Sequence, residues 1–437
     1  MDKTVRYILI LSCFLIFQKD AFCQKVLEYE YMPPNITWDN FLVKEGEASQ
    51  ETISMLFDKK GFLWSGTKTG LYRFDGIRYV EYGVSKEGSK GFKGYEVLDI
   101  FEDSQGIIWV GTSEALNKLD QTSGTFTSYI PDSANYDGIS NFIRAIREDR
   151  SGLLWILTRK DIFSFDKNQE KFTKYEVDTL SWYQNNTLFF YQNQCFTEDP
   201  DGNKWFVTNR GLYLLDNKEQ TFRMVLPDHA RPDLADFKKV NCVITDSSGS
   251  LWIGTEGWGL LKWNYRESRP ESVLIQPQQN DNELIKSITT LLPDNKDGII
   301  WCFGNSSFSK YDSRTGSVIN YVFKYHNRTV YESPQSKVWI YQAFEYSDGT
   351  IWFFNMTAGL MFKFDQHSEK LYLYRTPFFM AFKCILDNTG SFWFACIRNN
   401  IIRMETKLVP YVSIQISNTA HVSPEHKTNI VEDNLDR

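Results

Sequence analysis

The chain has 437 residues, of which 42% are hydrophobic and 16% aromatic, so it can bury a sizeable core. Its formal net charge of −7 and isoelectric point near 5.5 argue against nucleic acid or an anionic membrane surface as a partner. Two of the seven cysteines lie within the first 23 residues, and the other five have no short spacing. This excludes a disulfide framework and a cysteine metal site.

The first residues of the chain have a pattern that is typical of an export signal. Lys3 and Arg6 precede the apolar stretch Tyr7 to Phe17, and a small-x-small cleavage site ends at Cys23. Eleven apolar residues span only about half a bilayer, which argues against a membrane anchor. We therefore predict a signal peptide over residues 1–23 and a periplasmic location for the mature chain.

Eight copies of one short phrase then follow, each with a glycine and a tryptophan three residues later. Six copies carry an aspartate three residues before the glycine, and the other two have Asn295 and Tyr346 in that place. The tryptophans recur every 41 to 51 residues, and such a period is typical of repeat folds. They are Trp64, Trp109, Trp155, Trp205, Trp252, Trp301, Trp352 and Trp393.

The second copy indicates what one unit is. Val97–Phe101 is a short apolar run, and Asp103–Gly106 supplies turn chemistry. Ile107–Thr112 is apolar on both alternating faces, and two more short strands follow before Tyr129. Four short antiparallel strands in about 45 residues predict one blade of a β-propeller.

The repeated residues are interpreted as structural. Trp109 is expected to wedge between neighbouring blades, and Gly111 to let the next blade approach closely. The recurring aspartates are expected to form turns. Asp199–Asn203 resembles a calcium loop, but it lacks the glycine at loop position six and the closing glutamate of that motif.

A propeller needs a strand that closes its ring, and we assign Ile36–Val43 to this task. We predict an all-β fold in which residues 24–376 form a seven-bladed β-propeller of four-stranded antiparallel blades. Residues 377–437 would then hold the first blade of a truncated second propeller, centred on Trp393, and a loose tail. The alternative is a single eight-bladed ring. Because Asn429–Arg437 resembles the approach to another hairpin, we expect the chain to stop as a ninth blade begins.

Two places are candidates for ligand binding. Ser181–Gln192, between the third and fourth units, is rich in aromatic and amide side chains and includes Trp182, Tyr183 and Tyr191. Trp258 lies in a glycine-flanked turn of the fifth unit. Aromatic planes beside amides suit sugar rings. The alternatives are a packed aromatic loop for the first place and a plug for the second.

The repeats resemble the two-component regulator propeller repeats of bacterial hybrid two-component sensors. The matching residues are the Asp-x-x-Gly-x-x-Trp phrases, the Trp-x-Gly-Thr of the first, second and fifth units, and Gly70–Gly76. Exported sensor regions of that family carry two seven-bladed propellers, followed by a membrane span and a histidine kinase. The resemblance implies periplasmic sensing, frequently of glycan fragments. No phosphoacceptor histidine box or ATP-binding glycine motif is recognisable, so we do not expect kinase activity of this chain.

A carbohydrate-active propeller enzyme is the main alternative function, and a protein-interaction platform is another. The spacing from aspartate to tryptophan fits neither sialidase nor quinoprotein repeats, and no pair of carboxylates stands out for glycoside hydrolysis. We therefore predict no catalytic residue, no metal and no cofactor. The expected partners are a small-molecule or oligosaccharide ligand, and either a second copy of the chain or a separate sensor kinase.

Overall fold

The computed structural model describes residues 22–27, 29–31, 36–41, 51–84, 91–134, 139–176, 194–208, 211–226, 239–246, 248–264, 271–272, 287–294, 298–304, 307–323, 340–355, 359–378, 380–396 and 401–405. Within these ranges, no helix is long and apolar enough to cross a membrane.

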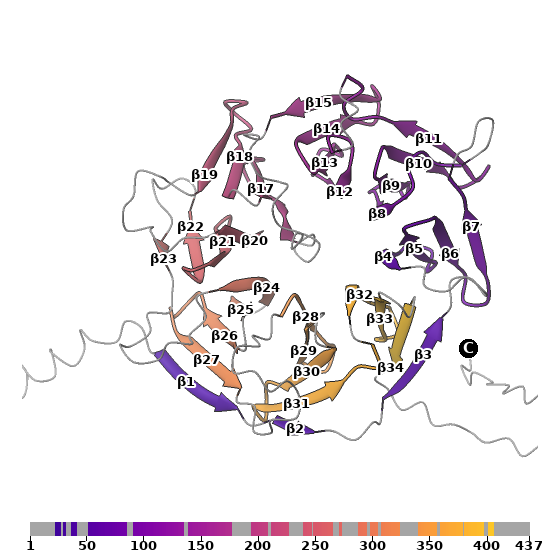
Figure 1. Ribbon diagram of the computed structural model, residues 1–437. Helices are drawn as coiled ribbons and strands as arrows, with labels where there is room; N and C mark the ends of the chain where they lie inside the picture. Colours follow the sequence, from indigo (N-terminus) through magenta and orange to yellow (C-terminus); the bar gives the residue numbers. More distant parts are fainter. Residues whose placement is uncertain are drawn as a thin grey trace, which may run out of the picture.

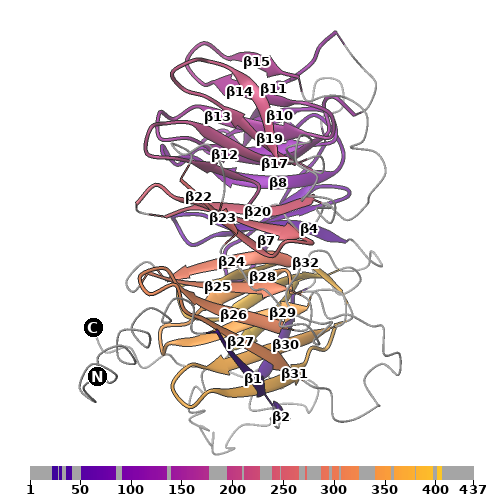
Figure 2. The same ribbon diagram turned by 90° about the vertical axis from the view of Figure 1, so that its left-hand side faces the viewer.

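The described strands form eight sheets, or blades, arranged in one ring around an axis (Figure 1), and Figure 2 shows the ring edge-on. Pairing between consecutive strands of a blade is antiparallel. Blade 1 consists of β4 (Thr52–Phe57), β5 (Leu63–Thr67), β6 (Leu71–Phe74) and β7 (Tyr79–Tyr82), and blade 2 consists of β8 (Val97–Glu102), β9 (Ile108–Thr112), β10 (Leu116–Asp120) and β11 (Thr125–Tyr129). Blade 3 consists of β12 (Ile143–Glu148), β13 (Leu154–Thr158), β14 (Ile162–Asp166) and β15 (Lys171–Tyr175), and blade 4 consists of β16 (Phe196–Glu198), β17 (Lys204–Thr208), β18 (Gly211–Leu215) and β19 (Phe222–Leu226). Blade 5 consists of β20 (Lys239–Thr245), β21 (Leu251–Glu256), β22 (Leu260–Trp263) and β23 (Glu271–Ser272), and blade 6 consists of β24 (Ile288–Asp294), β25 (Ile299–Gly304), β26 (Ser307–Asp312), β27 (Val318–Phe323) and β1 (Phe22–Leu27). Blade 7 consists of β28 (Gln342–Glu345), β29 (Thr350–Asn355), β30 (Leu360–Asp365), β31 (Lys370–Arg375) and β2 (Tyr29–Tyr31), and blade 8 consists of β32 (Ala381–Leu386), β33 (Phe392–Cys396), β34 (Ile401–Glu405) and β3 (Thr37–Phe41).

Each recurring aspartate holds the hairpin between the first two strands of its blade. In blade 2, Asp103 Oδ1 accepts the backbone N–H groups of Gln105 and Ile107, and Asp103 Oδ2 accepts the indole N–H of Trp109 at 2.9 Å. The same indole contact occurs in all six blades that have this aspartate, at 2.7 to 2.9 Å. The prediction that these aspartates are turn formers is confirmed.

The tryptophan next to this turn fills the space between two blades. Trp109 is 1% exposed and packs with Ile143 of β12 and Phe165 of β14 in the next blade. A Cβ added at Gly111 would lie 2.6 Å from the Cγ2 atom of Ile143, which is closer than carbon atoms pack. Both sequence predictions for this interface are confirmed: the large side chain of Trp109 fills the space between two blades, and Gly111 leaves room for the next blade to approach.

The prediction of a seven-bladed ring is wrong, and the alternative of a single eight-bladed ring is confirmed. The closing strand β3 pairs antiparallel with β34 of the Trp393 blade, whereas the outer edge of β31 is occupied by β2. Trp393 is 6% exposed and packs with Met55, Tyr72 and Phe74 of blade 1. Residues 381–405 therefore complete the first ring instead of starting a second one, because blade 8 buries one face against blade 7 and the other against blade 1.

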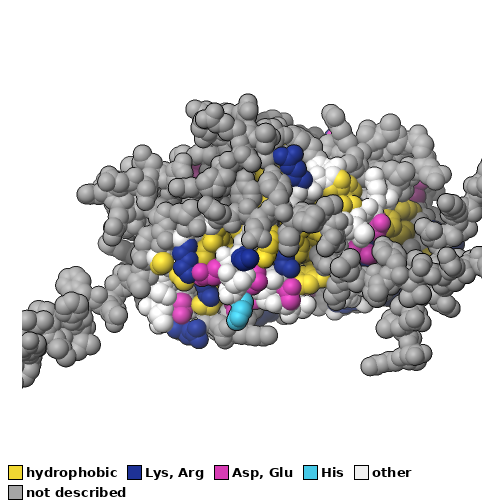
Figure 3. Space-filling model, turned by 90° about the horizontal axis from the view of Figure 1, so that it is seen from below, with side chains coloured by type: hydrophobic (Ala, Val, Ile, Leu, Met, Phe, Trp, Pro, Cys, Tyr) yellow, Lys and Arg dark blue, Asp and Glu magenta, His cyan; other side chains and the backbone are white. Residues whose placement is uncertain are grey.

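The N-terminal segment runs along the outside of blades 6 to 8 before the ring begins (Figure 1). β1 pairs parallel with β27 and β2 pairs parallel with β31, and Lys25 of β1 forms an ion pair with Glu369 of blade 7. Figure 3 views the molecule from this side, where acidic and basic side chains are interspersed. β1 begins at Phe22, and its residues from Gln24 onward fall within the predicted mature chain.

Candidate functional site

The strand order gives the ring two different faces. The aspartate hairpins lie at one end of the blades, which we call the hairpin face. The turns between second and third strands, and the connections from one blade to the next, lie at the other end, which we call the loop face. A ligand site has to be sought on both faces and at the axis between them.

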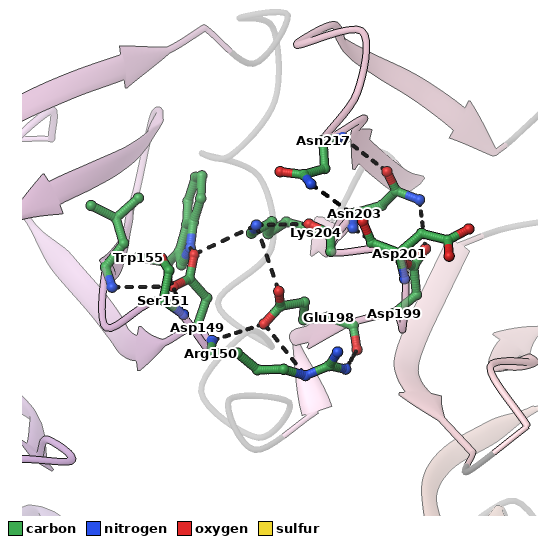
Figure 4. Close-up of polar contacts among 12 residues, drawn as sticks. Asp149, Arg150, Ser151, Trp155, Glu198, Asp199, Asp201, Asn203, Lys204 and Asn217 are labelled. Atoms are coloured by element: carbon green, nitrogen blue, oxygen red, sulfur yellow. Dashed lines mark hydrogen bonds and ion pairs between the residues drawn. The ribbon is translucent and has the colours of Figure 1, made fainter.

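On the hairpin face, charged side chains join neighbouring blades. Figure 4 shows Asp149, Glu198 and Lys204 converging between blades 3 and 4. Glu198 accepts the backbone N–H of Arg150 at 2.9 Å, and Lys204 Nζ lies 3.6 Å from Glu198 and 3.7 Å from Asp149. The same arrangement joins blades 2 and 3, where Lys167 Nζ lies 2.7 Å from Glu148 and 3.0 Å from the blade-2 turn aspartate.

These contacts lower the pKa of two turn carboxylates, Asp103 and Asp149. Burial raises the pKa of Asp103, but hydrogen bonds from Trp109 and Ile107 and the nearby Lys167 ammonium outweigh burial and leave the pKa below its usual value. A carboxylate that is kept ionised by this many hydrogen-bond donors serves to hold the fold together. The acidic residues between blades 2, 3 and 4 on this face are therefore explained by contacts that join these blades.

The loop that resembles a calcium site is one of these turns. Asp199 Oδ1 accepts the backbone N–H groups of Asp201 and Asn203, and Asp199 Oδ2 accepts the side-chain amide of Asn203 and the indole of Trp205 (Figure 4). N–H donors therefore surround both oxygens that a cation would need. In the part of the chain that the structure describes, no group of three His, Cys, Asp or Glu residues could hold a metal ion.

The predicted ligand residues are only partly visible. Trp182, Tyr183 and Tyr191 lie outside the described residues. Trp258 lies in the turn between β21 and β22, on the loop face, and its backbone N–H donates to Thr255 Oγ1 at 3.2 Å. Its side chain is half-buried and packs against the apolar cluster between blades 3 and 5. Trp258 therefore combines a packed side with a side that meets solvent on the loop face.

A charged cluster that the sequence analysis did not identify lies at the axis. Asp99 of β8, Arg147 of β12 and Lys383 of β32 come from three inner strands (Figure 1). Asp99 Oδ2 accepts the backbone N–H of Ile146 at 2.9 Å and Arg147 Nη1 at 3.1 Å. Asp99 Oδ1 lies 3.8 Å from Lys383 Nζ. We call Asp99, Arg147 and Lys383 the axial cluster.

The axial cluster is enclosed by protein but reached by solvent. The side chain of Asp99 is 3% exposed, whereas those of Arg147 and Lys383 are 20% and 19% exposed. Burial lowers the pKa of Lys383, while the Asp99 carboxylate opposes this shift and the Arg147 guanidinium adds to it. Beside them, burial raises the pKa of the Cys195 thiol, so this sulfur is neutral and is not an activated nucleophile.

Other polar side chains line the loop-face end of the inner strands. Gln194 reaches from the start of blade 4 to blade 6, where its amide bonds the backbone N–H and C=O of Leu291. Arg144 and Arg159 of blade 3 lie over the ring of Phe142, at 5.8 and 3.4 Å from its centroid. Burial and Arg159 lower the pKa of Arg144 to about 10, so it remains charged at neutral pH.

The axial cluster can bind but is not arranged for hydrolysis. Glycoside hydrolysis uses two facing carboxylates. Among the described residues of the axial cluster and its neighbours, Asp99 is the one carboxylate, and both its oxygens face cations or N–H donors. The sequence carried a signal for part of this site, because Asp99 and Lys383 each interrupt an apolar run of an inner strand; Arg147 carried none, because its strand also holds Arg144 and Glu148.

A protein-family model described as a two component regulator propeller matches residues 91–114, 137–160 and 236–257. These matches cover the first hairpins of blades 2, 3 and 5. The chain therefore carries repeats of this kind, and the resemblance seen in the sequence is confirmed. A comparison with curated protein sequences gives no match.

Solved structures with a similar fold include natural and designed proteins. The extracellular domain assigned to a hybrid two-component system of B. thetaiotaomicron is 20% identical, with a TM-score of 0.47 over 85% of this chain and 53% of that one. Virginiamycin B lyase from Staphylococcus aureus is 12% identical, with a TM-score of 0.49 over 85% and 99%. The computationally designed Ika8 protein is 10% identical, with a TM-score of 0.53 over 82% and 97%. At these identities the likeness concerns the fold alone, and the chain spans about half of the hybrid-system domain.

Proposed function

We propose that this propeller, which carries two-component regulator propeller repeats, is a periplasmic ligand-sensing region of a two-component system and has no catalysis of its own. The ligand is a small molecule derived from a glycan, and it binds on the loop face. The signal passes to a kinase through a partner protein or through another part of the sensor.

The observation that carries this proposal is the contrast between the faces. On the hairpin face, Glu148 and Glu198 accept backbone N–H groups of the preceding blade, and Asp103 and Asp149 lie within 3.7 Å of a lysine of the next blade. At the axis, Arg147 and Lys383 keep about a fifth of their surface exposed, although they lie on buried inner strands. Partly solvated charges within a ring of fixed strands form a preorganised binding site, which is what a sensor needs.

Trp258 adds an apolar surface on the same face. Its packed side fixes the ring against the cluster of blades 3 to 5, so stacking of a sugar on the solvent side would cost little side-chain entropy. The aromatic residues Trp182, Tyr183 and Tyr191 belong to the same proposal on sequence grounds. A protein-interaction platform is the second candidate, but no described surface favours it.

Binding and turnover can be tested on one oligosaccharide panel. We expect calorimetric binding of at least one member, with no new product by chromatography after prolonged incubation. Trp258→Ala should weaken binding about 2–10-fold, the range for loss of one aromatic stacking contact, while Trp258→Phe should retain most of it. Product formation would establish an enzyme instead, and absence of binding across neutral and acidic members would contradict glycan sensing.

A further inference from the structure

The central parts of the inner strands carry excess positive charge, although the chain as a whole has a net charge of −7. The charged residues in this region are three cations, Arg144, Arg147 and Lys383, and one carboxylate, Asp99. The region is the central part of the inner strands and excludes their hairpin-face ends, which carry carboxylates such as Glu102 and Glu148; it comprises residues 53–56, 98–101, 144–147, 194–197, 241–244, 289–292, 341–344 and 382–385. Cations gathered in a partly desolvated place are costly unless an anion accompanies them.

Asp99 supplies only part of the needed negative charge. Its Oδ2 atom already accepts two hydrogen bonds, from the Ile146 backbone and from Arg147. Its Oδ1 atom lies 3.8 Å from Lys383 Nζ, which is too far for a hydrogen bond. Among the described residues, none accepts a hydrogen bond from Lys383 Nζ, although an ammonium has three donors to satisfy.

We propose that Lys383 and Arg147 form an anion-binding site at the axis, which receives a carboxylate or sulfate group from the loop face. Lys383 donates hydrogen bonds to the anion, and the adjoining guanidinium of Arg147 adds charge. Arg144 and Arg159, on the same side of the ring, make the approach electropositive. This inference rests on the proposed function, because it treats the bound anion as part of the sensed ligand. It identifies an acidic glycan as the ligand class.

The first test uses the unmodified protein. Melting is measured with sodium sulfate against sodium chloride at equal ionic strength and at low millimolar sulfate, so that general screening cancels and the general stabilisation of folded proteins by sulfate is negligible. We expect sulfate to raise the melting temperature. By calorimetry, a uronic-acid oligosaccharide should bind at least tenfold more tightly than its neutral counterpart. Equal melting in both salts, together with equal affinity for the two oligosaccharides, would overturn the proposal whatever the variants do.

The second test uses matched lysine variants. Lys363 is the control, because its Nζ also lies 3.8 Å from a carboxylate, that of Asp348, but on a third strand near the hairpin face. Lys383→Met should abolish the sulfate effect, Lys383→Arg should retain it, and Lys363→Met should leave it unchanged. An undiminished sulfate effect in folded Lys383→Met would refute the site.

The outcomes separate this site from the proposed function. If neutral oligosaccharides bind as tightly as acidic ones and Lys383→Met has no effect, the anion site is wrong while sensing stands. If sulfate binding depends on Lys383 but no oligosaccharide binds, the site stands for free anions, and the assignment of an acidic glycan falls together with glycan sensing.

Discussion

Replacing two interblade tryptophans by phenylalanine should have different costs, because only one of the two indoles has a hydrogen-bond partner. Trp109 Nε1 donates to Asp103 at 2.9 Å. Trp352 Nε1 is buried and has no hydrogen-bond partner among the described residues, because Tyr346 stands where its blade would need the aspartate. Both side chains are almost fully buried, at 1% and 3% exposure.

The difference in unfolding free energy between the two variants follows from subtracting the costs that both replacements have in common. Each replacement removes the same volume from a similar interface, so the cavity terms nearly offset each other. Trp109→Phe also removes a hydrogen bond to a charged group, worth about 1.5–3 kcal/mol. Trp352→Phe removes an N–H group that is already buried without a partner, which is a gain for the folded state. We expect Trp109→Phe to cost about 2 kcal/mol more than Trp352→Phe.

Urea unfolding followed by circular dichroism measures this difference from the midpoints, provided that the slope of the transition is unchanged. A double-mutant cycle with Asp103→Asn isolates the indole–carboxylate contact, and its coupling energy should account for most of the gap. If Trp352→Phe is as costly as Trp109→Phe, the aspartate contact contributes little and our account of the repeated phrase is wrong.

Three further predictions concern the ring. Gly111→Ala should destabilise the fold by about 1–3 kcal/mol through overpacking, whereas Gly83→Ala, with no atom within 4 Å of the added Cβ, should be neutral within about 0.5 kcal/mol by the same urea assay. Phe41→Ala should lower the melting temperature more than Asn40→Ala, because Phe41 of the closing strand packs on aromatic rings of blades 8 and 1 while Asn40 is exposed. The pKa of Asp103 is depressed in the folded state. The Asp103 carboxylate therefore stabilises the fold at pH values above its unfolded-state pKa of about 3.9, and this stabilisation is lost as the pH falls through the folded-state pKa. The difference in unfolding free energy between wild type and Asp103→Asn should accordingly narrow from pH 6 to pH 3.

The local parts of the fold could be predicted because each is encoded within a few residues. The aspartate, the glycine and the tryptophan of one hairpin lie within seven positions of each other, and their roles follow from turn chemistry and side-chain size. Trp109 and Gly111 needed no knowledge of the rest of the ring, since any next blade would meet them in the same way.

The number of blades could not be predicted in this manner. The closing strand β3 carries no mark of its partner, and its sequence fits the edge of β31 as well as that of β34. The choice depends on β2, which already occupies the edge of β31. The axial cluster was missed for a related reason, because Asp99 and Lys383 are 284 residues apart and meet only once eight blades place β8 and β32 around one axis.

The extra N-terminal strands are found on the two blades that lack the repeated aspartate. Blades 6 and 7 have Asn295 and Tyr346 at that position, and Asn295 lies outside the described residues. The same two blades carry a fifth strand, β1 on β27 and β2 on β31. Each added strand satisfies backbone groups along an outer edge with which no further described strand pairs in blades 1 to 5.

The added strands also join the two blades to each other. Glu369 of blade 7 accepts hydrogen bonds from Lys25 of β1 and, at 3.2 Å, from the hydroxyl of Tyr321 in blade 6. On the hairpin face, Tyr346 donates to the carbonyl of Gly390 in blade 8, a contact that does not restore a partner for the Trp352 indole. In blades 1 to 5 and 8, a buried carboxylate holds the hairpin. Blades 6 and 7 lack it, and the N-terminal strands β1 and β2 stabilise these two blades at their outer edges instead. This explains how two blades can lose the aspartate of the repeat and still belong to one closed ring of eight.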